Sequence, residues 1–336
     1  MTLQTPLLAG SAGVGVLLAT AVATVATAVA AAAPGAAPTS APPTFLGPLH
    51  TITRVASTVP ANGDLNPYGV AVVPRTLGRL HRGDILVSNF NDRTNAQGTG
   101  TSIVAVSPTG RRALFARVDP HALPGPCVGG VGLTTALGVT TSGWVVVGSL
   151  PSRDGTAATA RAGCLLVLDD RGRVRKTLSG HGINGPWDMT LAEHRNRVDL
   201  FVSNVLNGTV RASGKVVHRG TVLRITLALR GDLPPERLST TTVGSGFAER
   251  SDPEALVVGP TGVGLGRDDT LYVADTVDHR LSALPDVSDR TTSAGRGRDR
   301  AARNRSPVGV SSCGSTRRPG RRRSRSACSS PGRGPS

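Results

Sequence analysis

The sequence predicts an all-β repeat protein, and three observations carry this prediction. Glycine (42 residues) and proline (24 residues) make turns frequent in a chain of 336 residues. Aromatic residues make up only 3%, so the core must consist mainly of Val, Leu, Ile and Ala, which favours short strands over long amphipathic helices. A pattern of strand, turn and strand also recurs four times after residue 50.

Each copy of the repeat begins with a Gly/Pro turn and a short apolar strand. A turn follows, then a second apolar strand that ends in a small polar residue, and then a third strand. The second strands read ILVSN, WVVVG, LFVSN and LYVAD, and such continuous apolar runs are typical of strands buried on both faces. The four copies span residues 66–111, 134–174, 183–229 and 259–284.

The spacing of the copies indicates a β-propeller. The anchors Gly69, Gly138, Asp188 and Gly262 are 69, 50 and 74 residues apart, whereas a propeller blade takes about 40–50 residues. The excess lies in polar or Gly/Pro-rich insertions, residues 153–162 and 231–252, which we predict to be loops. The sequence therefore predicts four-stranded blades, about four of them visible, in a ring that is incomplete at the C-terminus.

A further strand is predicted before the first copy. Residues 50–59 (HTITRVASTV) alternate polar and apolar side chains, as an edge strand does. In many propellers a strand in this place completes the last blade and closes the ring. We predict that closing role for residues 50–59.

The fourth copy carries a family resemblance. Its text, GPTGVGL followed by LYVADTVDHRL, resembles an NHL repeat, and residues 50–288 resemble exported bacterial propellers of the NHL-repeat and gluconolactonase-like (senescence-marker-like) family. The resemblance implies a six-bladed ring. For lactonase-like members it also implies a divalent metal such as calcium, held in the central channel by Glu, Asn and Asp oxygens. The N-terminal part of this chain has no match for the Glu ligand.

Five residues are candidates for a ligand site. Asn89, Asn204 and Asp275 each follow a second strand, where they either face the channel or cap a turn. Trp187 and Asp188 begin the third copy, where Trp187 either packs in the core or lines a ligand face. The segments NGPWDMT and VSNVLNGT hold three of the five, so we expect a ligand there first.

The predicted function follows from these candidates. No Ser, His and Asp are paired at a spacing that indicates a nucleophile, so we predict no catalytic residue. The favoured function is an exported propeller scaffold without a cofactor, which binds an unknown protein or carbohydrate. The alternative is a metal-dependent, lactonase-like hydrolase with its site in the central channel.

The N-terminus indicates export. Residues 6–33 form an almost unbroken apolar run that ends in small residues, which predicts a secretory signal over residues 1–33. An uncleaved membrane anchor is the alternative, and membrane contact is expected only through this segment. A Pro/Ala-rich linker (34–48) then precedes the propeller (49–290). We expect a secreted or cell-envelope protein.

The strong positive charge belongs to a C-terminal tail. Residues 290–336 hold 13 Arg and one Asp, a net charge of +12 that leaves only +4 of the total +16 for the remaining chain. A nucleic-acid partner is therefore not predicted. Residues 291–336 form a basic low-complexity tail, read as disordered, as a linker remnant or, as we favour, as the product of a shifted reading frame.

Two of the four cysteines lie inside the repeat region. Export permits disulfides, so we predict a bridge between Cys127 and Cys164, with two buried thiols as the alternative.

Overall fold

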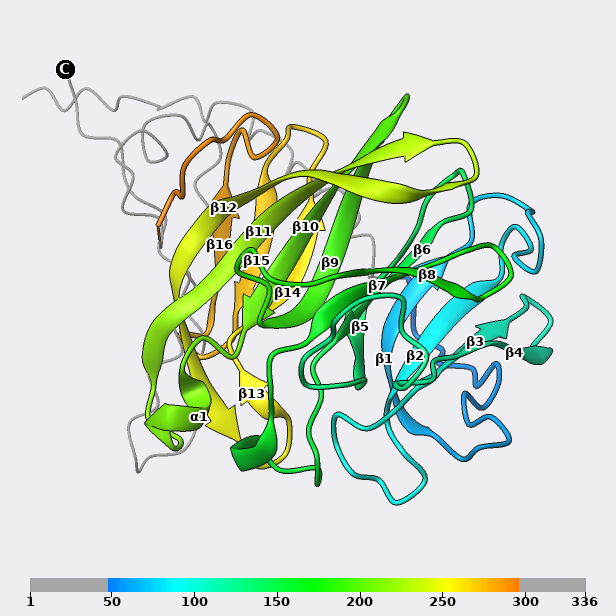
Figure 1. The fold of residues 1–336 in the computed structure, drawn as a ribbon, viewed down its shortest axis with the longest axis horizontal. Coiled ribbons are helices and arrows are strands. Elements are labelled where there is room, and N and C mark those ends of the chain that lie inside the picture. The colour runs from blue at the N-terminus through cyan, green and yellow to red at the C-terminus, as the bar shows by residue number, and fades with distance from the viewer. Residues whose placement is uncertain (1–47, 296–336) are drawn as a thin grey trace, which may run out of the picture. The chain divides into compact units, whose positions relative to one another are not determined.

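The described part of the chain, residues 48–295, folds into four antiparallel sheets (Figure 1). The computed structural model describes residues 48–295, and the sheets all belong to the compact unit that begins at Arg54. The predicted signal segment, almost all of the linker and all but residues 291–295 of the tail lie outside the described residues. Within residues 48–295, no helix is long and apolar enough to cross a membrane.

Each sheet is one blade, and each corresponds to one copy of the repeat. Blade 1 contains β1 (Leu65–Val72), β2 (Ile85–Asn91), β3 (Ser102–Val106) and β4 (Arg112–Arg117). Blade 2 contains β5 (Leu133–Val139), β6 (Val145–Ser149), β7 (Cys164–Leu168) and β8 (Val174–Leu178). Blade 3 contains β9 (Gly185–His194), β10 (Arg197–Val205), β11 (Val217–Arg230), β12 (Leu233–Asp252) and β13 (Leu256–Val258). Blade 4 contains β14 (Pro260–Leu265), β15 (Leu271–Asp275) and β16 (Arg280–Leu284).

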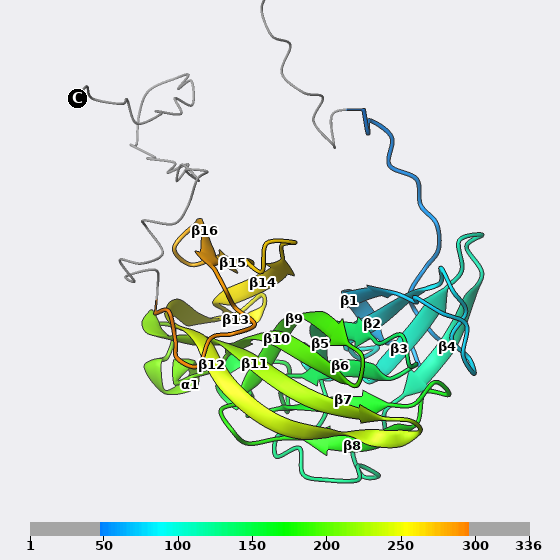
Figure 2. The same cartoon turned by 90° about the horizontal axis from the view of Figure 1, so that it is seen from above.

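The first strands of the four blades lie side by side around a common centre. β1 packs against β5, β5 against β9, and β9 against β14. Figure 2 shows the sheets following one another around this centre, with blade 1 and blade 4 at the two ends of the series. The predicted β-propeller, with about four visible blades, is thereby confirmed. Blades 1 and 2 have the predicted four strands, whereas blade 3 has five and blade 4 has three. Two short helices, Ala157–Thr159 and α1 (Thr209–Ala212), lie in loops.

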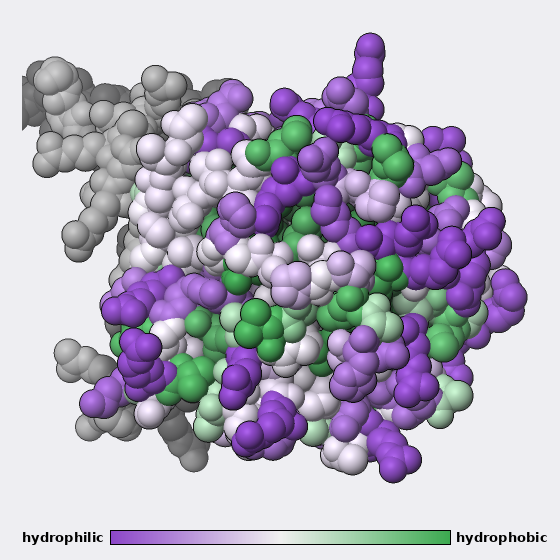
Figure 3. Space-filling model, viewed as in Figure 1, coloured by the Kyte–Doolittle hydropathy of each residue, from purple (hydrophilic) through white to green (hydrophobic). Residues whose placement is uncertain are grey.

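The core consists of layers between neighbouring blades. One cluster, which includes Phe115 and Leu137, fills the space between blades 1 and 2. A second, with Val167 and Met189, lies between blades 2 and 3, and a third, with Phe201 among its members, lies between blades 3 and 4. Strands β3, β6 and β7 are buried at every position, which explains why their sequences are continuous apolar runs. On the face shown in Figure 3, by contrast, hydrophobic residues form small separate groups among hydrophilic ones.

The turns between outer strands are built as the sequence predicts. In the turn between β7 and β8, Oδ1 of Asp169 accepts hydrogen bonds from the backbone N–H groups of Arg171 (3.0 Å) and Arg173 (2.9 Å). Gly172 adopts a φ of +80° there, a conformation that glycine reaches without steric cost. An aspartate cap and a glycine therefore fix this turn.

Two predictions about the ends of the repeats are wrong. Residues 50–59 form no strand, because blade 4 lies at the other end of the series and offers them no partner. Residues 54–59 instead form a strap over blade 1, in which the Thr58 carbonyl accepts a hydrogen bond from Nδ2 of Asn89 (2.9 Å). Residues 231–252 are not a loop, since most of them form β12, which pairs with β11 along its length.

The strand register also corrects one anchor. Three of the four predicted anchors, Gly69, Asp188 and Gly262, occupy the same position in their blades. Each lies on the first strand, next to the equivalent residue of the second strand, β2, β10 or β15. In blade 2 the equivalent residue is Ala136, two positions before the predicted Gly138, because an irregularity in β5 between Leu133 and Leu137 inserts extra residues.

Candidate functional site

Hydroxyl groups join the first strands of neighbouring blades. Oγ of Ser88 accepts a hydrogen bond from the Gly69 N–H (2.9 Å) and donates one to the Thr134 carbonyl of the next blade (2.7 Å). Ser203 occupies the same position in blade 3, where it accepts from the Asp188 N–H (3.0 Å) and donates to the Thr261 carbonyl (3.4 Å). These contacts fix the first strands, which position every group at the centre of the propeller.

Blade 2 achieves the same connection with a different residue. Gly148 occupies the position at which blades 1 and 3 have a serine. In blade 2 the hydroxyl groups that bond to the next blade come from the first strand, β5. Oγ1 of Thr134 donates to the Pro186 carbonyl of blade 3 (2.7 Å), and the neighbouring Thr135 hydroxyl donates to the Trp187 carbonyl. A substituent on Gly148 would collide with Thr134, since a Cβ there would lie 2.4 Å from its hydroxyl.

Three of the predicted site residues hold their own blades together. Asn89, Asn204 and Asp275 occupy the same position, the end of the second strand, and all three are fully buried. Each bonds to its own third strand: Asn89 to Ser102 (3.1 Å), Asn204 to Thr221 (2.9 Å) and Asp275 to Arg280 (2.9 Å). The structure therefore places them in three separate blades rather than around one ligand.

These positions bear on the metal that the family resemblance implies. Within residues 48–295, no group of three or more His, Cys, Asp or Glu side chains is arranged to hold a metal ion. Nδ2 of Asn89 and Nδ2 of Asn204 each donate to their own third strand, and Oδ2 of Asp275 accepts a hydrogen bond from Arg280 of its own third strand. This donor set does not fit a shared divalent cation, so we derive no metal-dependent step.

The fourth predicted residue, Trp187, belongs to an aromatic cluster at the centre. Tyr68 stacks on Phe90 with ring centroids 4.5 Å apart, and Trp187 approaches them at 5.8 Å and 6.0 Å. Tyr68 and Trp187 occupy equivalent positions of β1 and β9, one residue after a proline. Because blades 1 and 3 are not neighbours, this contact crosses the centre of the propeller. Tyr68 is half-buried, and burial raises its pKa above the usual value of 10.0.

Asp188 lies next to Trp187 and joins blades 3 and 4. Its Oδ2 accepts a hydrogen bond from the backbone N–H of Val263 on β14 (2.9 Å). The side chain is half-buried, and burial raises the pKa of Asp188 above its usual 3.8, against the opposing effect of backbone hydrogen bonds from Val263 and Met189. A partly desolvated carboxyl group that contacts blade 4 therefore follows the buried Trp187 directly in the chain.

Sequence reasoning missed two residues of interest. Tyr68 is the first, although the matching texts NPYG and GPWD are a signal that pairs it with Trp187. The second is Glu249, which is fully buried on β12 and whose Oε1 accepts the Asn207 N–H (2.9 Å). Its Oε2 has no hydrogen-bond partner among the described residues, and burial raises the pKa of Glu249 from 4.5 to about 7. No sequence signal marks Glu249, since it lies in a polar stretch.

Cys127 and Cys164 form a disulfide with their Cα atoms 5.4 Å apart. The bond links the segment between β4 and β5 to the first residue of β7. It therefore ties the connection between two blades to the interior of blade 2.

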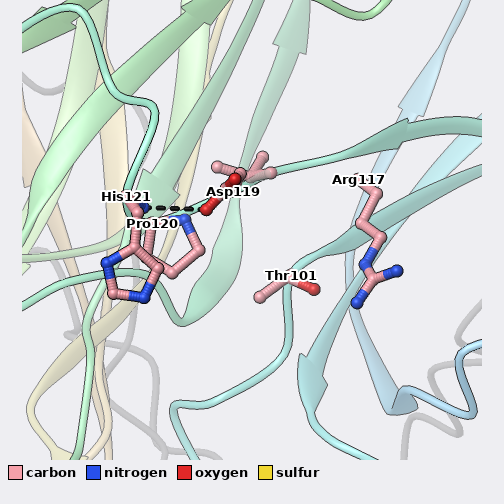
Figure 4. Close-up of a pocket in the computed structure, with 6 residues that line it drawn as sticks. Thr101, Arg117, Asp119, Pro120 and His121 are labelled. Atoms are coloured by element: carbon pink, nitrogen blue, oxygen red, sulfur yellow. Dashed lines mark hydrogen bonds between the residues drawn. The ribbon is translucent and has the colours of Figure 1, made fainter.

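A pocket of about 480 Å³ lies away from the aromatic cluster, beside the end of β4. Figure 4 shows Arg117 and His121 on opposite sides of this pocket, with Thr101 and Asp119 between them. Oδ1 of Asp119 accepts the backbone N–H of His121 (2.9 Å), which fixes the turn. Four of the six lining residues are exposed, so this is a feature of the surface rather than an enclosed site.

Comparison with known proteins yields similar folds and no family. No family model and no curated protein matches the chain. Similar solved structures are virginiamycin B lyase from Staphylococcus aureus with quinupristin (15% identity, 68% of this chain, 55% of that chain, TM-score 0.38) and a gluconolactonase from Xanthomonas campestris (12%, 67%, 74%, 0.34). The nidogen/laminin complex is a third (13%, 65%, 75%, 0.34).

The chain spans about half the length of the first two lyase chains that it resembles. Similarities at this level carry no argument about substrate or mechanism. The propeller architecture rests on the four sheets themselves.

Proposed function

We propose that this chain is an exported β-propeller that binds a carbohydrate at Tyr68, whose half-buried ring packs on the buried rings of Phe90 and Trp187. One observation carries the proposal: the equivalent aromatic residues Tyr68 of blade 1 and Trp187 of blade 3 meet at the centre of the propeller, and the residue after Trp187, Asp188, has a half-buried carboxyl group. Ligand sites are typically apolar and aromatic surfaces with a few convergent polar groups.

A sugar ring fits this chemistry. Its C–H faces are apolar and pack against aromatic rings, while its hydroxyl groups seek acceptors at the rim. The Tyr68 hydroxyl is a polar group on the cluster itself, and Tyr68 offers a more accessible ring than Phe90 or Trp187. A carbohydrate therefore suits the site better than a flat protein surface, which would have to reach a half-buried ring.

Export is supported by two features of the chain. The apolar run over residues 6–33 has the composition of a secretory signal. The disulfide between Cys127 and Cys164 belongs in an oxidising compartment. Cell fractionation of the producing organism tests this part, and recovery of the protein from the cytoplasm would contradict it.

Binding is tested by titrating the protein with glucose-, galactose- and arabinose-based oligosaccharides and following tryptophan fluorescence. The chain has two tryptophans, so a Trp144→Phe variant assigns the signal to Trp187. Tyr68→Ala should weaken binding at least tenfold. Tyr272→Ala is the matched control, because Tyr272 is the other tyrosine and lies on blade 4. If no oligosaccharide binds, or if both tyrosine variants bind equally well, the proposal fails.

A further inference from the structure

Among residues 48–295, blade 1 and blade 4 each have one sheet face that no other blade covers. On blade 1 this outer face carries one row of Val70, Val87, Val104 and Leu114, because the strand register places these residues side by side. Val72 lies in the adjacent row of the same face. Val70 and Val72, both on β1, are 62% and 64% exposed. The part of this face formed by β1 is therefore exposed to solvent.

The outer face of blade 4 has a different shape. Its register places Gly262 beside Ala274 and Leu281, and Gly264 beside Tyr272 and Ala283. Leu281 is 67% exposed and Tyr272 is 40% exposed. Because Gly262 and Gly264 have no side chains, the surface of this face is recessed along β14. A Cβ added at Gly264 would meet nothing within 4 Å.

The interface between blades 2 and 3 shows which side chains pack against a glycine in such a position. A Cβ added at Gly138 on β5 would lie 2.7 Å from Cδ2 of Leu191 and 3.1 Å from Cε of Met189, both on β9. A glycine on one blade thus accommodates two large apolar side chains of the next blade. This packing is part of the second core cluster.

The strand registers show that the two free faces carry residues equivalent to Gly138 and to the Met189 and Leu191 that pack against it. Gly264 stands opposite Tyr272 as Gly138 stands opposite Val146, so the two glycines are equivalent. By the same comparison of β1 with β9, Val70 is equivalent to Met189 and Val72 to Leu191. The exposed valines of blade 1 and the open glycine of blade 4 are therefore the two halves of a contact that the molecule already makes internally.

The two free faces also carry residues equivalent to the partners of one polar contact between blades 2 and 3. The Thr135 hydroxyl of blade 2 donates to the Trp187 carbonyl of blade 3. The equivalent hydroxyl on blade 4 belongs to Thr261, which contacts the Thr276 hydroxyl at an exposed position. The equivalent carbonyl on blade 1 is that of Tyr68. A blade 1 placed against blade 4 would bring this donor and acceptor together.

We propose that a second copy of this chain docks head to tail, with blade 1 of one copy on the outer face of blade 4 of the other. The contact pairs positions equivalent to those that pack at the internal blade interfaces, with Val72 over Gly264 and the Thr261 hydroxyl near the Tyr68 carbonyl. Such a contact joins two different surfaces, so association continues into a ring or a filament unless one face is blocked.

The strap of residues 54–59 defines how much of blade 1 is available. Ala56 packs against Val87, Val104 and Val106, in the outer part of the face. Val70 and Val72 on β1 lie outside that cluster. Blade 4 has only three strands, so it is narrow enough to use mainly this inner part.

The test is the oligomeric state of the full chain, measured by sedimentation velocity over a range of concentrations. The unmodified protein should form species larger than a monomer as its concentration rises. Val72→Lys and Gly264→Arg should each raise the dissociation constant at least tenfold. Leu233→Lys is the matched control, because Leu233 is also 64% exposed but lies on β12 of blade 3.

Mixing the two variants tests the head-to-tail arrangement. Val72→Lys leaves the blade 4 face intact, and Gly264→Arg leaves the blade 1 face intact. An equimolar mixture should therefore form a heterodimer and nothing larger. Circular dichroism melts should show that both variants remain folded, since neither position is buried in the monomer.

Two results would overturn the proposal. One is a monomer at all concentrations, which would mean that another part of the chain or another protein covers these faces. The other is association that Gly264→Arg leaves unchanged, which would assign the contact to a different surface.

Discussion

Single residues in this protein take their roles from their position in the blade. Asn89 and Asn204 occupy equivalent places, and the Nδ2 of each donates to a hydroxyl group of its third strand. Asn204 does more, because its Oδ1 also accepts the backbone N–H groups of Asn184 (2.8 Å) and Gly185 (3.1 Å). In blade 1, Oδ1 of Asn89 is buried without a partner among the described residues. Equivalent positions therefore differ in how well their polar atoms are satisfied.

This difference predicts unequal effects of two matched substitutions. Asn204→Ala should lower the free energy of unfolding more than Asn89→Ala, by about 1–3 kcal/mol, because it strands two buried N–H groups. Urea denaturation of both variants measures the difference. Equal losses, or a loss of carbohydrate binding without a loss of stability in Asn204→Ala, would show that Asn204 serves a ligand instead.

Glu249 predicts a dependence of stability on pH. Its pKa in the folded chain is about 7, above the ordinary 4.5, so folding favours the protonated form. Its burial costs nothing below pH 4.5, and the cost grows as the pH rises to about 7 and is constant above that. Glu249→Gln should therefore stabilise the protein at pH 8 by on the order of 3 kcal/mol and have little effect at pH 4.

Urea unfolding at both pH values checks this prediction. Glu236→Gln is the control, since Glu236 is a surface residue paired with Arg230 (3.3 Å) and should change little at either pH. A Glu249→Gln variant that is less stable than the unmodified protein at pH 8 would contradict the assignment.

At the scale of strands, the sequence predicts what is apolar and repeated. ILVSN, WVVVG, LFVSN and LYVAD were recognisable because strands covered on both faces must be continuously apolar. β12 was not, because its segment LPPERLSTTTVGSGFAERSD is polar and forms a strand only through pairing with β11. Residues 54–59 show the reverse case, since an alternating pattern found no partner strand and became a strap.

The candidate site was predictable only in part, for a similar reason. Trp187 and Asp188 stand in distinctive text, and the structure places them at the centre of the propeller beside Tyr68. The polar residues at the ends of the second strands look alike in sequence whether they bind a ligand or their own sheet. Only the hydrogen-bond partners of Asn204 and Asp275 distinguish the two roles.

The disulfide gives a prediction at this scale. It closes a segment of 37 residues between two blades, so reduction should lower the free energy of unfolding by roughly 2–4 kcal/mol, mainly by freeing the unfolded chain. Thermal melts with and without a reducing agent measure this effect. The same shift in a variant with Cys313→Ser and Cys328→Ser would assign it to Cys127–Cys164, whereas loss of the shift would assign it to the tail.

The whole molecule is a series in which the sheet face of each blade packs against the sheet face of its neighbours. The contact of Tyr68 with Trp187 additionally joins blades 1 and 3. The interior blades 2 and 3 pack on both sides, while blades 1 and 4 pack on one side each. Stability in such a series is close to a sum over blades and their interfaces, so the ends have the least. The same missing interfaces leave Val72 exposed and Gly264 uncovered.

Amide hydrogen exchange should therefore differ along the series. In dilute solution, β6, β7 and β10 should exchange slowest and β16 faster, because local opening costs least where a blade has one neighbour. At high concentration, head-to-tail docking covers the outer faces, and exchange should slow in β1 and β14 while β6 and β7 stay unchanged. Val72→Lys should abolish the concentration effect and preserve the dilute pattern. Uniform exchange across the four blades would show instead that the propeller unfolds as one unit. The end blades would then have no lower local stability for a second copy to raise.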